Sequence, residues 1–291
     1  MRSLWGIFAV ALCWALGLTG CALQSSRISS SIPGTLAESG YKEVLFNPHQ
    51  RLWYRAQQTG SAPALRLRVY IEGDGASWWQ RKIPPSDPTP RVSISAALAV
   101  LDDFPTVAYL PRPCQWLANV QSCPQAWWTG GRFGEEVIAL SMNSLDWLKH
   151  QTGAFELELI GHSGGGTLAV LLAARRPDVH CVITLASPLD TEAWARAMSV
   201  GALRESHNPL TVAAGLHDVP MWHYFGSQDE IAPEEISKLF LQKWPHAKSV
   251  VIEGWTHTKP WVTRAREFKK ENCLMDARAS DSTSRSPGTD L

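Results

Sequence analysis

Residues 155–175 have the sequence FELELIGHSGGGTLAVLLAAR. The run 155–160 is short and rich in Leu and Ile, which predicts a strand. Residues 168–175 are rich in Ala and Leu, with leucines at helical spacing, and predict a helix. The segment between them, 161–165, is Gly-His-Ser-Gly-Gly and predicts an abrupt turn. The rest of the chain is understood most easily as built around this strand, turn and helix.

The turn contains the pattern G-x-S-x-G, with Ser163 at its centre. Between a strand and a helix this pattern is the nucleophile elbow, a tight turn that lifts a serine hydroxyl above the edge of a sheet. Gly161 and Gly165 are needed because a Cβ at either position would collide with a neighbouring strand or helix. The five residues alone are a common pattern, so the prediction depends on the strand before them and the helix after them.

Predicted strands and helices alternate along the chain from residue 65 onward, and two further strands precede them. This alternation predicts a single α/β domain with a mostly parallel central sheet and helices on both faces. In such sheets, reactive side chains lie just beyond the carboxyl ends of the strands. The predicted strands are 44–46, 52–54, 65–71, 107–110, 155–160, 182–185, 221–225 and 250–252, and the other helices are 93–102, 133–150, 234–244 and 260–271.

The composition is that of a globular chain with a substantial core and no polyanion partner. Of its 291 residues, 45% are hydrophobic and 19% are charged, and the formal net charge is zero. No cluster of Lys and Arg forms a basic patch, so we expect no nucleic-acid partner. The sequence contains no Walker A pattern, no H-E-x-x-H and no C-x-x-C. We therefore expect neither a metal site nor a cofactor.

An acyl-transfer serine needs a histidine to take its proton and a carboxylate to orient that histidine. Asp229 and His257 each stand in a loop directly after a predicted strand, where the chemistry of a parallel sheet is expected. Asp190, just after another strand, is the alternative acid, and Asp218 is a weaker one. The candidates therefore occur in the order Ser163, acid, histidine.

Residues 43–272 resemble an α/β-hydrolase-fold protein of the kind found among bacterial exported lipoproteins. Three motifs carry the resemblance: the elbow G-H-S-G-G, the post-strand G-S-Q-D-E, and the late G-W-T-H. The order serine, acid, histidine is also that of α/β-hydrolases. The resemblance implies that Ser163 is the nucleophile, His257 the general base and then acid, and Asp229 the orienting acid.

The oxyanion hole of such a site combines the N–H after the nucleophile, here Gly164, with an N–H from the loop after the strand 65–71. That loop is Glu-Gly-Asp-Gly, where relatives often have His-Gly-x, so Asp74 is the expected second donor and Gly75 the next. An aspartate side chain facing the site would oppose the developing negative charge. It must therefore turn away or bind a neighbouring donor.

Several tryptophans fall in the loops at this edge of the sheet, and no insertion there is long enough for a large lid domain. Residues 188–219 are too few for one, so we expect an open or modestly covered site. The tryptophans could form an apolar or sugar-stacking wall, or could simply anchor the loops to the domain. They are Trp78, Trp79, Trp127, Trp128, Trp255 and Trp261.

The N-terminus resembles a bacterial lipoprotein signal. A short apolar run ends in Leu-Thr-Gly-Cys, which implies that Cys21 is lipidated and anchors the mature protein. Ala22 is not the aspartate typical of inner-membrane retention, so the outer membrane, facing the periplasm, is implied. An ordinary cleaved signal peptide or an uncleaved anchor is the alternative. The predicted segments are a signal peptide 1–20, a tether 21–40, the domain 41–275 and a disordered tail 276–291.

Export to an oxidising compartment would allow the remaining cysteines to form disulfides. Besides Cys21 and the cysteine in the signal peptide, the chain has Cys114, Cys123, Cys181 and Cys273, which permit three connectivities. Closeness in one loop favours Cys114–Cys123, and the expected course of the last helix favours Cys181–Cys273. Buried free thiols are the alternative for the second pair.

These features together predict a lipid-anchored serine hydrolase acting on a small-molecule carboxylic ester or thioester. A peptidase or amidase with the same triad is the second prediction. A non-catalytic envelope lipoprotein that uses the hydrolase scaffold as a binding module is the third, since a fold does not determine a function.

Overall fold

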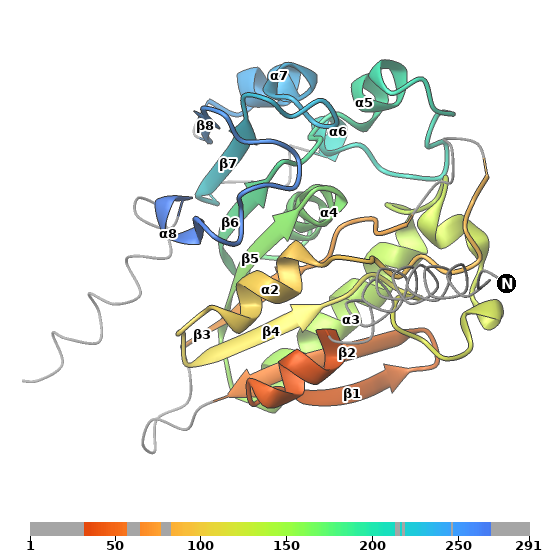
Figure 1. Ribbon diagram of the computed structural model, residues 1–291, viewed down its shortest axis with the longest axis vertical. Helices are drawn as coiled ribbons and strands as arrows, with labels where there is room; N and C mark the ends of the chain where they lie inside the picture. The colour runs from red at the N-terminus through yellow and green to blue at the C-terminus, as the bar shows by residue number, and fades with distance from the viewer. Residues whose placement is uncertain are drawn as a thin grey trace, which may run out of the picture.

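An eight-stranded sheet forms the centre of the molecule (Figure 1). The structure is a computed structural model that describes residues 32–56, 65–76, 83–212, 216, 219–245 and 247–268. The strand order is β1-β2-β4-β3-β5-β6-β7-β8, and only the pairs β1–β2 and β2–β4 are antiparallel. The strands are β1 Lys42–Asn47, β2 Gln50–Ala56, β3 Arg66–Ile71, β4 Thr106–Leu110, β5 Glu156–His162, β6 Val179–Leu185, β7 Met221–Gly226 and β8 Lys248–Ile252.

Helices cover both faces of this sheet, as the alternation of elements predicts. Residues of α2 and α8 pack with one face, and residues of α3, α4, α6 and α7 pack with the other. The helices are α2 Ile94–Val100, α3 Glu135–Thr152, α4 Gly164–Ala173, α5 Thr191–Ala197, α6 Pro209–Val212, α7 Glu234–Lys243 and α8 Ala265–Phe268, with short 3-10 turns η1 Val120–Ser122 and η2 Gln125–Trp128.

The period-two pattern of a strand explains the two cores. In β3, Leu67 and Val69 belong to the core on the α3 and α4 side, whereas Tyr70 belongs to the core on the α2 side. Helix α4 is buried along its whole length, because it lies between the sheet, α3 and α6. Its first turn, directly after Ser163, is therefore buried at the carboxyl end of β5.

Two boundaries differ from the sequence predictions. Residues 32–38 form a helix whose Leu36 is fully buried in the core, so the predicted tether 21–40 does not extend to residue 40. The helix predicted over 260–271 is, in the described chain, a turn followed by the four residues of α8. The signal peptide, Cys21 and the tail 276–291 lie outside the described residues.

The connection from β6 to β7 carries no separate lid domain in its described part. It contains two short helices, α5 and α6, which lie close to α7 and α4 (Figure 1). The expectation of an open or modestly covered site stays a prediction. No helix among the described residues has both the length and the apolar character that crossing a membrane requires.

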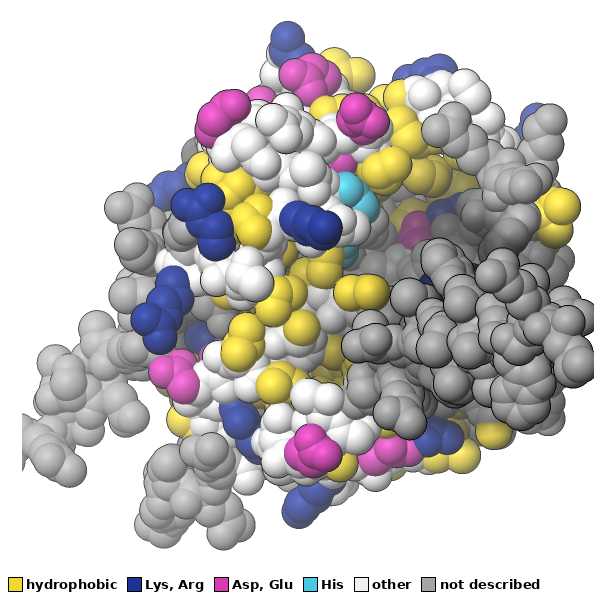
Figure 2. Space-filling view, in the orientation of Figure 1, with side chains coloured by type: hydrophobic (Ala, Val, Ile, Leu, Met, Phe, Trp, Pro, Cys, Tyr) yellow, Lys and Arg dark blue, Asp and Glu magenta, His cyan; other side chains and the backbone are white. Residues whose placement is uncertain are grey.

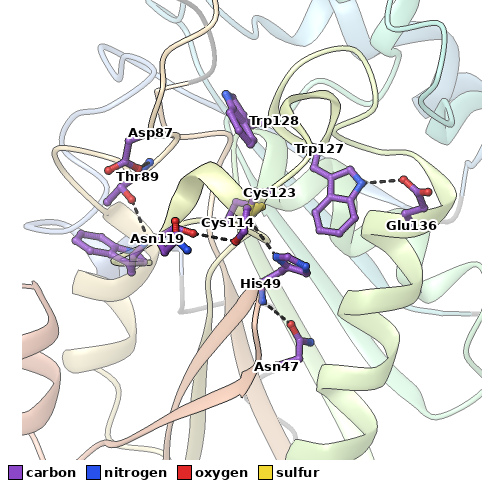
Figure 3. Close-up of a disulfide and its surroundings, with 12 residues drawn as sticks. Asn47, His49, Asp87, Thr89, Cys114, Asn119, Cys123, Trp127, Trp128 and Glu136 are labelled. Carbon is purple, nitrogen blue, oxygen red and sulfur yellow. Dashed lines mark hydrogen bonds between the residues drawn. A yellow bond between two sulfur atoms is a disulfide. The ribbon is translucent and has the colours of Figure 1, made fainter.

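A disulfide joins Cys114 and Cys123 and closes the loop after β4 (Figure 3). The Cys114 N–H donates to the carbonyl of His49, 2.8 Å away, and the Cys123 Sγ lies 3.6 Å from His49 Nδ1. The first predicted pair is thus confirmed. Cys181 is also disulfide-bonded, while Cys273 lies outside the described residues, so the second pairing stays a prediction.

Candidate active site

The turn between β5 and α4 holds Ser163 in an unusual backbone conformation. Its φ is 54° and its ψ is −128°, a region that residues other than glycine rarely adopt. The turn is held by a hydrogen bond from the Ser163 N–H to the Leu185 carbonyl on β6, at 2.8 Å. Strained backbone of this kind persists where the surrounding structure fixes it, and it is concentrated at functional sites.

The two glycines of the pattern are explained by backbone atoms close to them. A Cβ at Gly161 would lie 2.2 Å from the carbonyl carbon of Gly165, and a Cβ at Gly165 would lie 2.3 Å from the Ile71 carbonyl oxygen on β3. Since backbone cannot move aside, neither position accepts a side chain. The sharp turn predicted from the sequence is therefore a packing requirement of β3, β5 and α4.

The loops after β7 and β8 bring an acid and a histidine to Ser163. The Nε2 atom of His257 lies 3.0 Å from Ser163 Oγ, and its Nδ1 atom lies 3.0 Å and 3.2 Å from the two carboxylate oxygens of Asp229. These three side chains are the ones that the sequence predicted. Their arrangement is that of a nucleophile, a base and an orienting acid.

The carboxylate of Asp229 is buried and held ionised. It accepts hydrogen bonds from the N–H groups of Ile231 and Ala232, at 2.8 Å and 2.9 Å. Burial by itself raises the pKa of Asp229, but the hydrogen bond to His257 and the two backbone donors outweigh it and lower the pKa below its ordinary value. The acid can therefore stabilise a positive charge on His257.

The alternative acid, Asp190, has a different task. It is the N-cap of α5, and its carboxylate accepts from the N–H groups of Glu192 and Ala193, both at 3.1 Å, and from Asn208 Nδ2 at 2.9 Å. The weaker alternative, Asp218, lies outside the described residues. The geometry thus favours Asp229 as the triad acid.

The loop after β3 approaches the nucleophile from the other side. A Cβ built on Gly73 would lie 3.5 Å from the Ser163 Cβ, so this backbone passes directly beside the reactive serine. The Gly73 N–H donates to the carboxylate of Glu72 at 2.8 Å and is not available to a substrate. The N–H groups of Asp74 and Gly164 donate to no protein acceptor within the described part of the chain. They are the two donors that the sequence predicts for an oxyanion.

The side chain of Asp74 binds neighbouring donors, one of the two outcomes expected for it. Its Oδ1 atom accepts from Arg112 Nη1 at 2.9 Å, and its Oδ2 atom accepts from Arg132 Nη1 at 2.7 Å. Burial raises the pKa of Asp74, and the two guanidinium groups lower it by more, so the net direction is down. Sequence reasoning did not find either arginine.

Comparison with solved structures assigns the fold. The chain superposes on the proline iminopeptidase of Mycobacterium smegmatis with a TM-score of 0.58 and 14% identity, over 83% of this chain and 98% of that one. It superposes on an esterase of Pyrococcus furiosus with a TM-score of 0.52 and 13% identity, over 84% and 94% of the two chains. The chain has the α/β-hydrolase fold. No protein-family model matches it, and no curated protein matches it in sequence.

Within this hydrolase fold, His162 connects the elbow to the histidine loop. Its Nε2 atom lies 2.7 Å from the carbonyl oxygen of His257, and the two rings are 5.2 Å apart. Because a carbonyl only accepts, Nε2 of His162 carries the proton. Burial, and then the neighbouring His257, lower the pKa of His162 to about 3, so the ring stays neutral. Its place next to the nucleophile in the sequence was the signal that could have found it.

A second set of side chains, also missed from the sequence, holds the loop after β3. Gln115 Nε2 donates to the Gly73 carbonyl at 3.1 Å, and the carboxylate of Glu72 accepts from Tyr109 Oη at 2.6 Å and from the Ser93 hydroxyl. Burial raises the pKa of Glu72 against the effect of these donors. The hydrolase fold thus braces the predicted oxyanion loop through β4 and the loop that follows it.

The tryptophans in described loops are anchors. Trp255 and Trp261 are buried and pack edge to face with ring centroids 4.8 Å apart. Trp128 is buried, and its Nε1 donates to the Pro85 carbonyl at 3.1 Å. Trp127 donates from Nε1 to Glu136 at 2.8 Å (Figure 3). Trp78 and Trp79 lie outside the described residues. The anchor interpretation therefore holds for the four that can be placed.

The face that carries the site has hydrophobic as well as charged side chains (Figure 2). Figure 2 shows histidine side chains at a recess of this face with hydrophobic side chains beside them. Among the residues that the structure describes, no group of three His, Cys, Asp or Glu side chains is arranged to hold a metal ion.

Proposed function

We propose that this protein is a serine hydrolase that cleaves a carboxylic ester or thioester through an acyl-enzyme on Ser163. The observation that carries the proposal is the pair of contacts made by His257, 3.0 Å to Ser163 Oγ and 3.0 Å to the carboxylate of Asp229. A histidine between a serine and a buried carboxylate can take the serine proton as the hydroxyl attacks a carbonyl carbon.

In the first half of the reaction, Ser163 Oγ bonds to the carbonyl carbon and its proton passes to His257 Nε2. Asp229 stabilises the imidazolium, and the N–H groups of Gly164 and Asp74 donate to the oxyanion. His257 then gives the proton to the leaving alcohol or thiol as the tetrahedral intermediate collapses. In the second half, His257 takes a proton from water as the water oxygen attacks the acyl carbon. His257 then returns this proton to Ser163 Oγ as the bond between Oγ and the acyl carbon breaks and the acid is released.

A fluorophosphonate probe tests this proposal. The wild-type protein should be labelled, Ser163→Ala should not, and Ser141→Ala should be labelled like the wild type. Ser141 is a suitable control because it is a buried serine of α3 whose hydroxyl donates to the Val137 carbonyl at 2.8 Å. Absence of wild-type labelling, under conditions that label a known esterase, would instead favour a non-catalytic binding protein.

Hydrolysis of an amide or peptide bond by the same residues is a second candidate. The likeness to the proline iminopeptidase and, at 20% identity over 84% of this chain and 38% of that one, to puromycin hydrolase supports it. Matched ester and amide substrates with the same acyl group separate the two. Turnover of the amide at a kcat/KM comparable with that of the ester would move the assignment to an amidase.

We also propose that Cys21 carries a lipid that anchors the protein to the outer membrane, facing the periplasm. The Leu-Thr-Gly-Cys segment supports this, and the disulfide at Cys114 and Cys123 is compatible with an oxidising compartment. In cells, Cys21→Ser should release the protein from the membrane fraction. Unchanged partitioning of that variant would favour an uncleaved N-terminal helix as the anchor.

A further inference from the structure

Gly164, directly after the nucleophile, has no side chain at the place where the Asp74 carboxylate lies. A Cβ built on Gly164 would be 2.0 Å from Asp74 Oδ1, and its next two neighbours would also be atoms of that carboxylate. Gly161 and Gly165 differ, because backbone atoms exclude their side chains. The φ of Gly164 is not positive, so its conformation suits any residue. Glycine is required here only because Asp74 fills the space.

The carboxylate that fills this space is held by arginines from two other loops of the chain. Arg112 comes from the loop after β4, and Arg132 comes from the loop before α3. Their side chains are 4% and 1% exposed, while that of Asp74 is 17% exposed. Arg112 Nη2 also donates to the Arg132 carbonyl, and the Arg112 guanidinium lies over the ring of Phe133 at 5.0 Å. The two arginines are therefore fixed relative to each other as well as to Asp74.

We propose that Asp74, held by Arg112 and Arg132, is a positioning residue that sets the geometry of the oxyanion hole. This inference rests on the proposed function. The carboxylate packs on the first turn of α4 and ties the loop after β3 to it, so the N–H groups of Asp74 and Gly164 keep a fixed separation. Its charge is matched by the arginines, so it does not oppose the oxyanion that it helps to position.

Loss of the Asp74 carboxylate should affect stabilisation of the transition state more than substrate binding. The oxyanion is fully formed only as the carbonyl carbon becomes tetrahedral, so misplaced donors lower kcat and leave KM nearly unchanged. Asp74→Ala should lower kcat by roughly 100-fold, the size expected when donors move by about 1 Å. A merely structural role would lower the melting temperature without this separation of kcat from KM.

Asp178→Ala is the matched control. Its carboxylate also binds two cations, Arg176 and Lys149, and its side chain is 20% exposed, close to the value for Asp74. It precedes β6, at the opposite edge of the sheet from Ser163. The control should be destabilised like Asp74→Ala and keep its kcat. Equal kcat for the two variants, measured with one soluble ester well below both melting temperatures, would overturn the inference.

A double-mutant cycle tests the contact itself. Gly164→Ala in the wild-type protein forces the methyl group into the Asp74 carboxylate and should lower kcat by a factor similar to Asp74→Ala. In the Asp74→Ala background the methyl group has room, so adding Gly164→Ala should lower kcat by less than a further threefold. If the loss of kcat in the double variant equalled the product of the losses in the two single variants, the residues would act independently, contrary to the proposal.

Small carboxylates provide a readout that a structural role would not move. The space left by Asp74→Ala keeps two guanidinium groups, so formate should bind there and raise kcat in a saturable way. Formamide, which has the same shape and no charge, should not. Failure of formate to raise kcat overturns the positioning role. If wild-type Ser163 is not labelled by the fluorophosphonate probe, the proposed function itself fails, and the two failures are distinguishable.

Discussion

His162 stands beside the nucleophile in the sequence, yet its side chain serves the general base. The hydrogen bond from His162 Nε2 to the His257 carbonyl fixes the loop after β8 against the elbow. Trp261 packs on the same histidine ring, with ring centroids 6.5 Å apart. His162→Ala should lower kcat by roughly 5- to 10-fold, because one hydrogen bond of about 1 kcal/mol no longer orients His257. His162→Gln, which keeps a donor of similar reach, should retain more activity. Steady-state kinetics of both variants checks this, and equal activities would argue that ring packing matters more than the hydrogen bond.

The two candidate acids give a second prediction at the level of single residues. Asp229→Asn should lower kcat by roughly 10⁴-fold, since an amide cannot hold His257 in the required tautomer or stabilise its charge. Asp190→Asn should leave kcat and stability nearly unchanged, because Asn is as good an N-cap as Asp. Kinetics and thermal unfolding of both variants decide between them. If Asp229→Asn kept the wild-type kcat and Asp190→Asn were inactive, Asp190 would be the acid of the triad.

Three site residues could be predicted because each has a local sequence signal. Ser163 lies in a glycine pattern, and Asp229 and His257 each follow a strand whose apolar run is evident. Arg112 and Arg132 have no such signal. They reach Asp74 from positions 38 and 58 residues away along the chain, and only the packing of the loops brings them together. The departure at Asp74 was visible in the sequence, whereas its compensation was not.

At the level of elements, the disulfide loop supports both stability and the site. Cys114 lies between Arg112, which holds Asp74, and Gln115, which holds the Gly73 carbonyl. Replacing Cys114 and Cys123 together by Ser should lower the free energy of unfolding by about 2 to 3 kcal/mol, the loop-closure value for a link of this length. It should also lower kcat below the unfolding transition, because the brace of the oxyanion loop loosens. Urea unfolding and kinetics of the double variant measure the two effects, and an unchanged kcat would confine the disulfide to a stabilising role.

The strands were predictable as elements because their apolar runs are short and bounded by Gly, Pro and Asp. The helix over 32–38 was not, because Pro33 and Gly34 stand near its start and a Ser-rich stretch precedes it, and burial of Leu36 in the core stabilises it. The end of the chain differed for a related reason. Pro260 and Trp261 suit a helix start, but Trp261 is buried against Trp255, and this packing keeps the segment in a turn until α8 begins at Ala265.

For the molecule as a whole, two buried histidines make stability depend on pH. Burial lowers the pKa of His162 and of His223 to about 3, below the value of 6.5 expected when the chain is unfolded. Between those values the unfolded chain takes up protons that the folded protein does not, so stability falls as the pH drops below about 6.5. Each histidine should cost about 2 kcal/mol of stability at pH 5. The lowered pKa values of Asp74, Asp178 and Asp229 act at lower pH, because their contribution is present above pH 4 and is lost only below it.

His223 allows this effect to be measured apart from the site, since it lies within β7, bonds to Thr184 Oγ1 at 2.8 Å and packs edge to face on Phe240. Burial raises the pKa of the carboxyl groups of Glu72 and Glu158, and a raised carboxyl pKa makes the protein more stable as the pH falls. The effect of His223 is therefore measured as the difference in stability loss between the wild type and a His223 variant. His223→Gln should lose about 2 kcal/mol less stability than the wild type when the pH is lowered from 7 to 5, because one of the protons taken up on unfolding is removed. Urea unfolding of the wild type and of His223→Gln at pH 7, 6 and 5 measures this difference. Parallel losses in wild type and His223→Gln would show that His223 is protonated equally in both states and that acid acts elsewhere in the fold.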